Sequence, residues 1–291
     1  MDYPELGTRV IRHDGDRESW SMAMRAPIPA LRGLVRGYCL YEERRTSLPT
    51  HQHLPQPDGV FIIGLDGNMD VRDPKGENCR VEAGEGFLGG LHTAPAQTRS
   101  ERHQRGMEID LTPLGTHLVL GGLPMDAIAN RVHSVEDLLG REGREFGERL
   151  AESTDDSATF EIVDSFLALR ILEPRHALSE GLEFAWDALS NSHGRVRISE
   201  ITEQLGWSRR RLVEEFRNAV GLGPKTTARI MRFDYALELW KADPAQPWTE
   251  VALTSGYHDQ AHFSREVRAL SGQTPSELAS HLLPESGGMA A

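Results

Sequence analysis

Three consecutive arginines follow Ser208 where the sequence takes on helical spacing: Arg209, Arg210 and Arg211. In the first turn of a helix, cationic side chains face the positive end of the macrodipole, so this run opposes local stability. A bound phosphate or guanine edge would remove the conflict, because arginine pairs bidentately with guanine O6 and N7 and helix N-termini bind phosphate. The run therefore indicates contact with a nucleic acid.

Histidines offer a second candidate chemistry. His51 and His53 alternate with Gln52, and His92 and His103 follow downstream. Alternate histidines on a strand point to one face, and imidazole suits Zn, Fe or Ni. No Glu follows at the distance expected of a metal-binding cupin barrel, and the neighbouring prolines favour a loop. We therefore expect solvated loop histidines and no bound metal or cofactor, with His51 and His53 as the candidates if a metal binds.

The patterns typical of catalytic nucleophiles and phosphate loops do not occur. The chain holds no Gly-x-Ser-x-Gly, and the glycines at 67 and 84–90 are not followed by Lys-Ser/Thr. Cys39 and Cys79 cannot form a four-cysteine zinc site or a disulfide scaffold. We expect no enzymatic activity. The alternatives are a metal-dependent barrel enzyme carrying a regulatory domain and a protein-interaction module.

A repeat in the last ninety residues positions the arginine run. Three positions recur at an offset of 50 and four at an offset of 51: Ile201, Gly206 and Trp207 as Val251, Gly256 and Tyr257, and Leu212, Phe216, Gly221 and Pro224 as Phe263, Val267, Gly272 and Pro275. Each unit is a short helix ending at Gly, a turn, and a second helix ending at Gly and then Pro. Ser208 and Asp259 are placed to cap the second helices. This is the pattern of a helix-turn-helix motif.

Each second helix divides into two faces at 100° per residue. The inner faces are apolar: Leu212, Phe216 and Ala219, then Phe263, Val267 and Leu270. The opposite faces carry Arg210, Glu214 and Arg217, then Ala261, Arg265 and Arg268. Between the units, residues 225–241 predict a helix that spans about 26 Å at the usual rise. Such a spacer would set the two second helices into successive major-groove turns, which lie about 34 Å apart.

The N-terminal part is typical of short strands. Residues 60–65 precede the hairpin turn signal Asp66-Gly67-Asn68, and 69–72 alternate after it. Met107, Ile109 and Leu111 alternate with Glu108 and Asp110, the period of a strand buried on one face. Residues 33–41 and 84–91 are further strand candidates. We expect a small barrel or sandwich of about 115 residues.

Helical spacing follows over residues 135–150, 160–172 and 178–189. The predicted fold class is α+β: a small, cupin-like β-barrel with a helix pair, then an all-α domain of two helix-turn-helix units joined by a linker helix. The expected boundaries are 1–155 for a β-rich sensor domain, 156–192 for the helix pair and candidate dimerisation segment, 195–284 for the helical domain, and 285–291 for a disordered tail.

The C-terminal ninety residues resemble the double helix-turn-helix domain of the AraC family of transcriptional regulators. The second half of the family signature matches Val251-Ala252, Gly256-Tyr257, residues 259–265 and Gly272-Gln273-Thr274-Pro275. The first half matches Leu205-Gly206, Ser208, Leu212, Phe216, Gly221, Pro224, Arg232 and Ala236-Leu237. Two departures are Glu214, where the family usually has Arg, and Val267, where it has a large aromatic residue. The N-terminal part resembles the family in layout alone.

The resemblance implies a sequence-specific regulator that binds double-stranded DNA through two successive major grooves. The expected contacts are Ser208, Arg209, Arg210, Arg211, Glu214 and Arg217 in one groove and Asp259, Gln260, Ala261, Ser264, Arg265 and Arg268 in the next. Arg210 and Arg265 are the first choices for bases, and Arg209, Arg217 and Arg268 for phosphates. The resemblance also implies a small-molecule effector at the N-terminal domain, a homodimer, and RNA polymerase as a further partner.

The total charge of −12 conceals an uneven distribution. Residues 1–194 hold 20 basic and 32 acidic residues, whereas 195–284 hold 12 and 11. The acidity therefore lies outside the predicted DNA-binding part, and the total does not exclude a nucleic-acid partner. Two cysteines, no apolar run long enough to span a membrane and no signal-peptide pattern predict a cytoplasmic protein.

Overall fold

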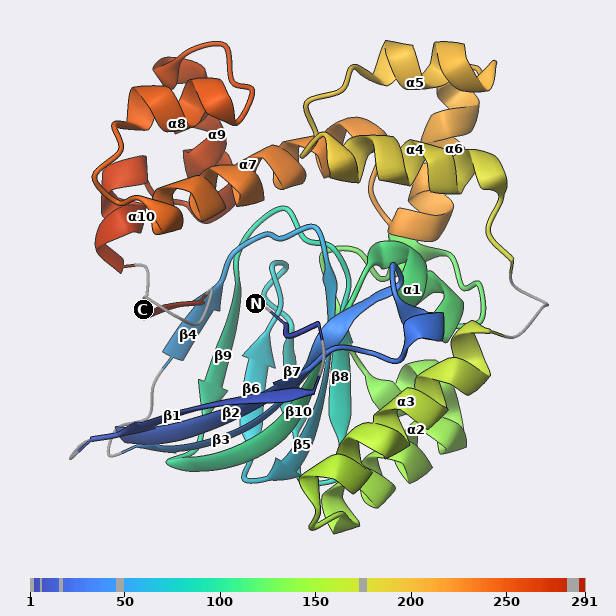
Figure 1. Ribbon diagram of the computed structural model, residues 1–291, viewed down its shortest axis with the longest axis vertical. Helices are drawn as coiled ribbons and strands as arrows, with labels where there is room; N and C mark the ends of the chain where they lie inside the picture. Colours follow the sequence, from blue (N-terminus) through green and yellow to red (C-terminus); the bar gives the residue numbers. More distant parts are fainter. Residues whose placement is uncertain are drawn as a thin grey trace.

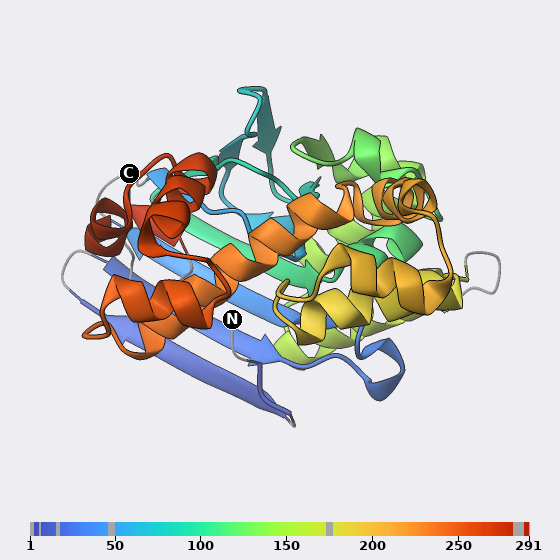
Figure 2. The ribbon, with the colours of Figure 1, turned by 90° about the horizontal axis from the view of Figure 1, so that it is seen from above.

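The computed structural model describes residues 3–5, 7–15, 18–45, 50–172, 177–281 and 288–290. Two antiparallel sheets and a few helices form the N-terminal part, and a row of helices lies across the top of the sheets (Figures 1 and 2). The predicted α+β class and the order of its parts are confirmed.

The larger sheet has seven strands in the order β1 (Thr8–Asp14), β2 (Glu18–Arg25), β3 (Val35–Arg45), β10 (His103–Leu111), β5 (Gly59–Asp66), β8 (Gly86–Gly89) and β11 (Val132–Ser134). The smaller sheet has the order β12 (Gly288–Ala290), β4 (Thr50–His53), β9 (Ala96–Ser100), β6 (Met69–Arg72) and β7 (Asn78–Val81). Neither sheet closes on itself, so the expected closed barrel is not seen: the strands form two open sheets around a shared interior.

The turn at Asp66-Gly67 is present, but the predicted hairpin is wrong. Gly67 has a φ of 75°, and its amide donates to Asp66 Oδ1 at 2.8 Å. β5 and β6 nevertheless lie in different sheets. Both edges of β5 are paired, with β10 and β8, so β6 cannot join it and instead pairs with β7 and β9. The turn therefore connects the two sheets.

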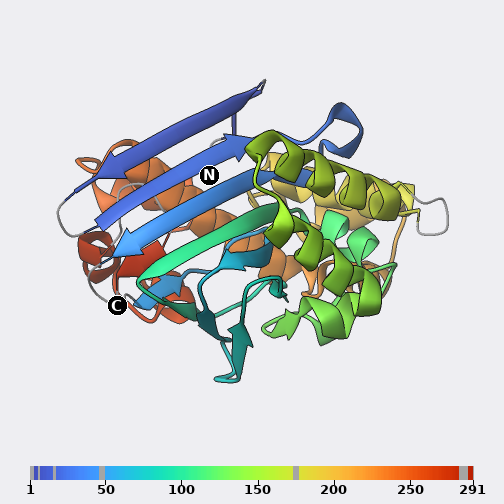
Figure 3. The ribbon, with the colours of Figure 1, turned by 90° about the horizontal axis from the view of Figure 1, so that it is seen from below.

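Strand β10 contributes to two interiors. Met107, Ile109 and Leu111 are fully buried in the main core, together with apolar side chains of α2 (Val135–Glu152) and α3 (Asp156–Ile171). These two helices lie against the outer face of the larger sheet (Figure 3). Ser134 and Asp155 cap them, each accepting a backbone N–H. The alternate positions, Glu108 and Asp110, line the space between the sheets.

The remaining helices are α1 (Pro113–Val119) and two 3₁₀ turns, η1 (Pro29–Leu31) and η2 (Met125–Ala127), in the N-terminal part, followed by α4 (Glu180–Asn191), α5 (Ile198–Leu205), α6 (Arg209–Val220), α7 (Pro224–Ala242), α8 (Trp248–Thr254), α9 (Gln260–Ser271) and α10 (Pro275–His281). Among the described residues, no helix is long and apolar enough to cross a membrane.

The helix pair expected over 156–192 is divided between the two parts. α3 packs in the main core with α2 and the larger sheet. α4 places Leu182, Ala185, Trp186 and Leu189 in a separate core with α5, α6 and α7. The physical reason is that the apolar face of α4 covers the first helix-turn-helix unit and is not free to pair with α3. α4 therefore packs with the C-terminal helices, while the boundary of the DNA-binding domain at 195 stays a prediction.

Among the described residues, the contacts that join the two parts include the following. The C-terminal end of α6 packs on α1 and η2, where Gly221, at a φ of 89°, lies so close that an added Cβ would come within 2.6 Å of the Met125 carbonyl oxygen. Leu54, in the loop after β4, is buried in the core formed by α7, α8 and α9. In the tail, expected to be disordered, Gly288–Ala290 pair with β4, while 285–287 and 291 lie outside the described residues.

Candidate nucleic-acid interface and adjoining cavity

The first helix-turn-helix unit consists of α5 and α6. Gly206 ends α5 in the left-handed region at a φ of 61°, which turns the chain into the second helix. Ser208 caps α6 by accepting the Arg211 N–H at 3.2 Å. Leu212 and Phe216 are fully buried, which fixes the rotation of α6 and leaves Arg209, Arg210 and Arg217 exposed.

The arginines of α6 differ in their partners. Arg210 Nε donates to Glu214 Oε1 at 2.7 Å, and the two side chains are 88% and 61% exposed. The Arg211 guanidinium lies 4.1 Å from the centroid of the Trp207 ring, which draws it back over the turn. The exposed face of α6 thus presents Arg209 and Arg217. Arg210 lies on the same face, paired with Glu214, the one carboxylate that is predicted to enter this groove.

The second unit repeats this construction in α8 and α9. Asp259 caps α9 by accepting the His262 N–H at 2.7 Å, so its carboxylate serves the helix N-terminus. Gln260 Oε1 accepts a hydrogen bond from the Thr249 hydroxyl at 3.2 Å. Ala261, Arg265 and Arg268 are exposed, while Ser264 is half-buried.

α7 separates the two units, which lie at its opposite ends (Figure 1). Its 19 residues correspond to about 28 Å at 1.5 Å per residue. Arg229 Nε donates to Glu266 of α9 at 2.6 Å, and Arg232 donates to the Gly194 carbonyl at 2.7 Å. These bonds tie the N-terminal half of α7 to α9 and to the turn after α4, so the two candidate recognition helices belong to one frame of packed helices.

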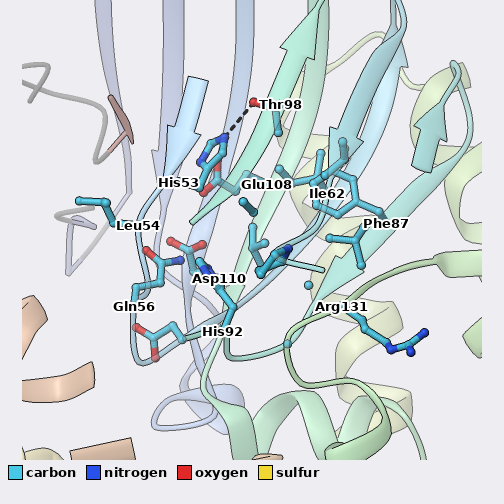
Figure 4. A pocket seen from close by; sticks show the side chains of 18 of the residues that line it. His53, Leu54, Gln56, Ile62, Phe87, His92, Thr98, Glu108, Asp110 and Arg131 are labelled. Carbon is cyan, nitrogen blue, oxygen red and sulfur yellow. Dashed lines mark hydrogen bonds between the residues drawn. The ribbon is translucent and has the colours of Figure 1, made fainter. Parts of the chain in front are cut away.

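A cavity of about 460 Å³ lies between the two sheets, below α7. Figure 4 shows His53, Gln56 and Asp110 on one side of it and Ile62 and Phe87 on the other, with Arg131 extending away from the carboxylate. Ile62 and Phe87 belong to a small apolar core that joins the sheets. The cavity therefore has one polar and one apolar wall.

Two neighbouring carboxyl groups dominate the polar wall. Burial, together with the nearby Asp110, raises the pKa of Glu108 to about 8. Burial also raises the pKa of Asp110, although the Tyr3 hydroxyl donates to its Oδ2 at 2.6 Å. The two carboxyl groups share a hydrogen bond, and no nitrogen or hydroxyl donor for Asp110 Oδ1 lies among the described residues. The pair therefore holds a proton near neutral pH and lacks a cation of its own.

The histidines lie on strand β4 and its surroundings, so the expected loop is wrong for His51 and His53. The polar residues are strand-forming here because β4 pairs with β9. Arg45 Nη1 donates to His51 Nε2 at 3.1 Å, and His53 Nε2 bonds the Thr98 hydroxyl at 2.8 Å. Burial lowers the pKa of His53 to about 4, so this imidazole is neutral.

Each of the two imidazoles thus has its Nε2 bonded to a neighbouring side chain. Within the described part of the chain, no three His, Cys, Asp or Glu side chains are placed to hold a metal ion. The cavity carboxylates were not among the residues singled out from the sequence. The signal was present in the alternation of β10, whose apolar face packs in the main core and whose acidic face meets the second sheet.

Comparison with known sequences concerns the C-terminal part. Residues 201–281 match a protein family described as a helix-turn-helix domain. An uncharacterised HTH-type transcriptional regulator of Staphylococcus aureus is 30% identical over 86 residues, which are 29% of this chain and 11% of that protein. A probable thc operon regulatory protein of Rhodococcus erythropolis is 31% identical over 111 residues, 37% of this chain and 33% of that one. The chain thus spans about a tenth and a third of these relatives.

Among solved structures, ToxT from Vibrio cholerae aligns over 91% of this chain and 98% of its own, at 10% identity and a TM-score of 0.49. The sequence match coincides with the two units seen in the structure, from Ile201 in α5 to His281 at the end of α10. The chain therefore carries a C-terminal helix-turn-helix domain of the AraC type.

Proposed function

We propose that this protein is a sequence-specific, DNA-binding regulator of transcription that reads two successive major grooves. The observation that carries the proposal is the pair of recognition helices, α6 and α9, held at the two ends of α7 with their arginines exposed. Arg210 and Arg265 would contact bases, and Arg209, Arg217 and Arg268 would contact phosphates. The names of the matched relatives, which are regulators of transcription, support the same role.

In this proposal, the two sheets form a cupin-like sensor for a small molecule, and the cavity beside α7 is its binding site. The position of the cavity supports the assignment, because Lys241 of α7 and Leu54 both line it. Leu54 is also part of the core of the second helix-turn-helix unit. A molecule in the cavity would therefore contact the frame that sets the two recognition helices.

Capture of fragmented genomic DNA on the purified protein, followed by sequencing, tests DNA binding. We expect enrichment of a few promoter fragments that share one motif. The double variant R210A/R265A should lose the enrichment, whereas R141A, which removes an equally exposed charge from α2, should keep it. Wild-type protein that enriches no sequence, from genomic or random duplex DNA, would contradict the proposal and favour the protein-interaction alternative.

We further propose that the protein acts as a homodimer through the outer side of α3. Leu169 is 78% exposed and Leu172, at the end of the helix, is 50% exposed, an apolar pair that a partner subunit would cover. Sedimentation equilibrium should show a dimer for the wild type and a monomer for L169R. L253R, on exposed α8, is the control and should stay dimeric. A dimer in L169R would remove α3 from the interface.

A further inference from the structure

The charged groups around the cavity are mainly acidic. They come from β10, from the loop after β4, from the adjoining strands and from α7: Glu108, Asp110, Asp58, Arg36, Arg131, Asp234, Glu238 and Lys241, together with the neutral His53 and His92. Arg36 is paired with Asp58 at 3.1 Å, and Arg131 with Glu77 at 3.4 Å. Among the described lysine and arginine side chains that line the two cavities, Lys241 is the remaining one, and it lies near Asp234, where it opposes the rise that burial causes in the pKa of that carboxyl group.

Asp110 provides an independent indication of a ligand. Its side chain lines the cavity and the residue is 9% exposed, yet no nitrogen or hydroxyl group among the described residues donates to its Oδ1, and its neighbour is the Glu108 carboxyl group, with which it shares a proton. The other oxygen, Oδ2, is engaged by the Tyr3 hydroxyl, which holds the carboxylate in place. Two adjoining carboxyl groups that face each other without a cation are unfavourable once both ionise. A ligand with a positively charged hydrogen-bond donor would supply the missing cation beside Asp110.

The apolar wall, opposite the two carboxyl groups, indicates that the rest of the ligand is apolar. Ile62, Val71 and Phe87 are buried side chains of both sheets, and Val60 and Val132 extend the same apolar surface. We propose that the cavity binds an organic cation, with a protonated amine or amidinium against Glu108 and Asp110 and an aliphatic or aromatic body against this wall. This inference rests on the proposed sensor role only in predicting that the ligand changes DNA binding.

The acidic lining of the cavity continues from the sheets of the N-terminal part to α7 of the helical part. A second cavity of about 810 Å³ shares Asp58, Asp110 and Lys241 with the first and adds Asp234 and Glu238 of α7. Burial, Glu238 and Asp58 raise the pKa of Asp234 to about 7, so acids of the two parts oppose one another. A bound cation between them would reduce this repulsion and strengthen the docking of α7 on the sheets.

Calorimetry with three probes of equal shape tests the ligand class: 4-phenylbutylamine, 4-phenylbutanol and 4-phenylbutanoate. We expect the full-length protein to bind the amine most tightly, the alcohol weakly and the carboxylate least. Equal binding of all three, preference for the carboxylate, or no heat with millimolar amine would overturn the proposal. The carboxylate is the informative competitor, because Lys241 is the group that would hold it.

Variants locate the site. D110N and E108Q remove charge but keep size, and each should weaken amine binding by about tenfold or more. D70N, which removes an exposed carboxylate from β6, should bind as the wild type does. Thermal unfolding identifies a variant that does not fold, and the ranking of the three probes on wild-type protein holds regardless. Unchanged affinity in a folded D110N would contradict the assignment.

Proton release separates binding at the carboxyl pair from apolar binding elsewhere. Because Glu108 holds a proton below pH 8, an ammonium group that replaces it should release that proton, and affinity should rise as the pH approaches 8. Affinity that is independent of pH would contradict this. DNA binding is then measured with and without the amine. A change in DNA affinity would support both the cation site and the regulatory function. Amine binding in a protein that binds no DNA would contradict the regulatory function and leave the cation site standing.

Discussion

Arg210 and Glu214 lie one turn apart on the exposed face of α6, and their pairing at 2.7 Å connects a predicted base contact with a predicted departure from the family. Exposed ion pairs of this kind contribute little to stability. Their effect is on the position of the guanidinium, because Nε is occupied while both terminal nitrogens stay free for a guanine edge. Glu214 thus orients Arg210 as well as facing the groove.

Replacement of Arg210 by alanine should weaken binding to the true operator by about tenfold to a hundredfold, because one bidentate base contact is lost. The preference at a single base pair should relax at the same time. Fluorescence anisotropy on the operator and on a set of point-substituted duplexes measures both. An equal loss on operator and random DNA would instead identify Arg210 as a phosphate contact.

Replacement of Glu214 by glutamine should act in the opposite direction on random DNA. Removing a carboxylate that repels phosphate raises non-specific affinity, whereas loss of an acceptor for cytosine N4 and release of Arg210 reduce discrimination. The ratio of specific to non-specific affinity should therefore fall. E200Q, on α5, is the control and should leave the ratio unchanged. A higher ratio in E214Q would show that Glu214 contributes no readout.

For single residues, the sequence predicted the helix caps correctly but did not predict the role of the cavity carboxylates. Ser208 and Asp259 were placed as caps from helical spacing alone, and both accept the backbone N–H three residues on. Glu108 and Asp110 were seen only as the polar side of a strand. Their role depends on what covers that side, and the covering strands β4, β6 and β9 are distant in sequence.

Elements stabilised by local interactions were predicted more accurately than elements stabilised by distant ones. The linker helix expected over 225–241 is α7, Pro224–Ala242, since its periodicity and its N-terminal Pro are local signals. The β5–β6 hairpin was wrong because strand partners compete, and β10 and β8 occupy both edges of β5. α4 was assigned to the wrong partner because an apolar helix face does not reveal which surface covers it.

The contact between α6 and η2 supports a prediction about this element. G221A must adopt a φ of 89° and place a methyl group 2.6 Å from the Met125 carbonyl, so it should lower the free energy of unfolding by more than the roughly 1 kcal/mol that a left-handed alanine costs. G206A is the matched control, with a φ of 61° and nothing within 4 Å of the added Cβ. Urea unfolding that gives both variants equal losses would show that α6 is free of the N-terminal part.

Over the whole molecule, charge divides as the chain does. The excess of acidic over basic residues belongs to the sheets and to α2–α4, while the two helix-turn-helix units are close to neutral. A nearly neutral DNA-binding domain has no broad basic field, so its affinity depends on a few exposed arginines and should be sensitive to salt. The acidic body repels DNA from the other faces, and a dimer on paired sites would restore affinity.

Half-buried acids also make the stability of the whole protein depend on pH. The pKa values of Glu108 and Asp234 are raised to about 8 and 7 in the folded protein. At any pH between the pKa of the unfolded carboxyl groups and these raised values, the folded state binds more protons than the unfolded state. Stability from these two groups is present at low pH and is lost as the pH rises. His53, whose pKa is lowered to about 4, acts in the opposite direction below about 6.5.

The window from about pH 6.5 to 8 therefore isolates the carboxyl groups. The urea midpoint of the wild type should fall across this window, because both acids must ionise in a buried, already acidic site. The double variant E108Q/D234N should show a flatter profile, and 4-phenylbutylamine should flatten the wild-type profile by supplying the missing cation. D70N should retain the wild-type slope, since Asp70 is exposed. A wild-type midpoint that rises over this window would contradict the assignment of these two carboxyl groups as the source of the pH dependence.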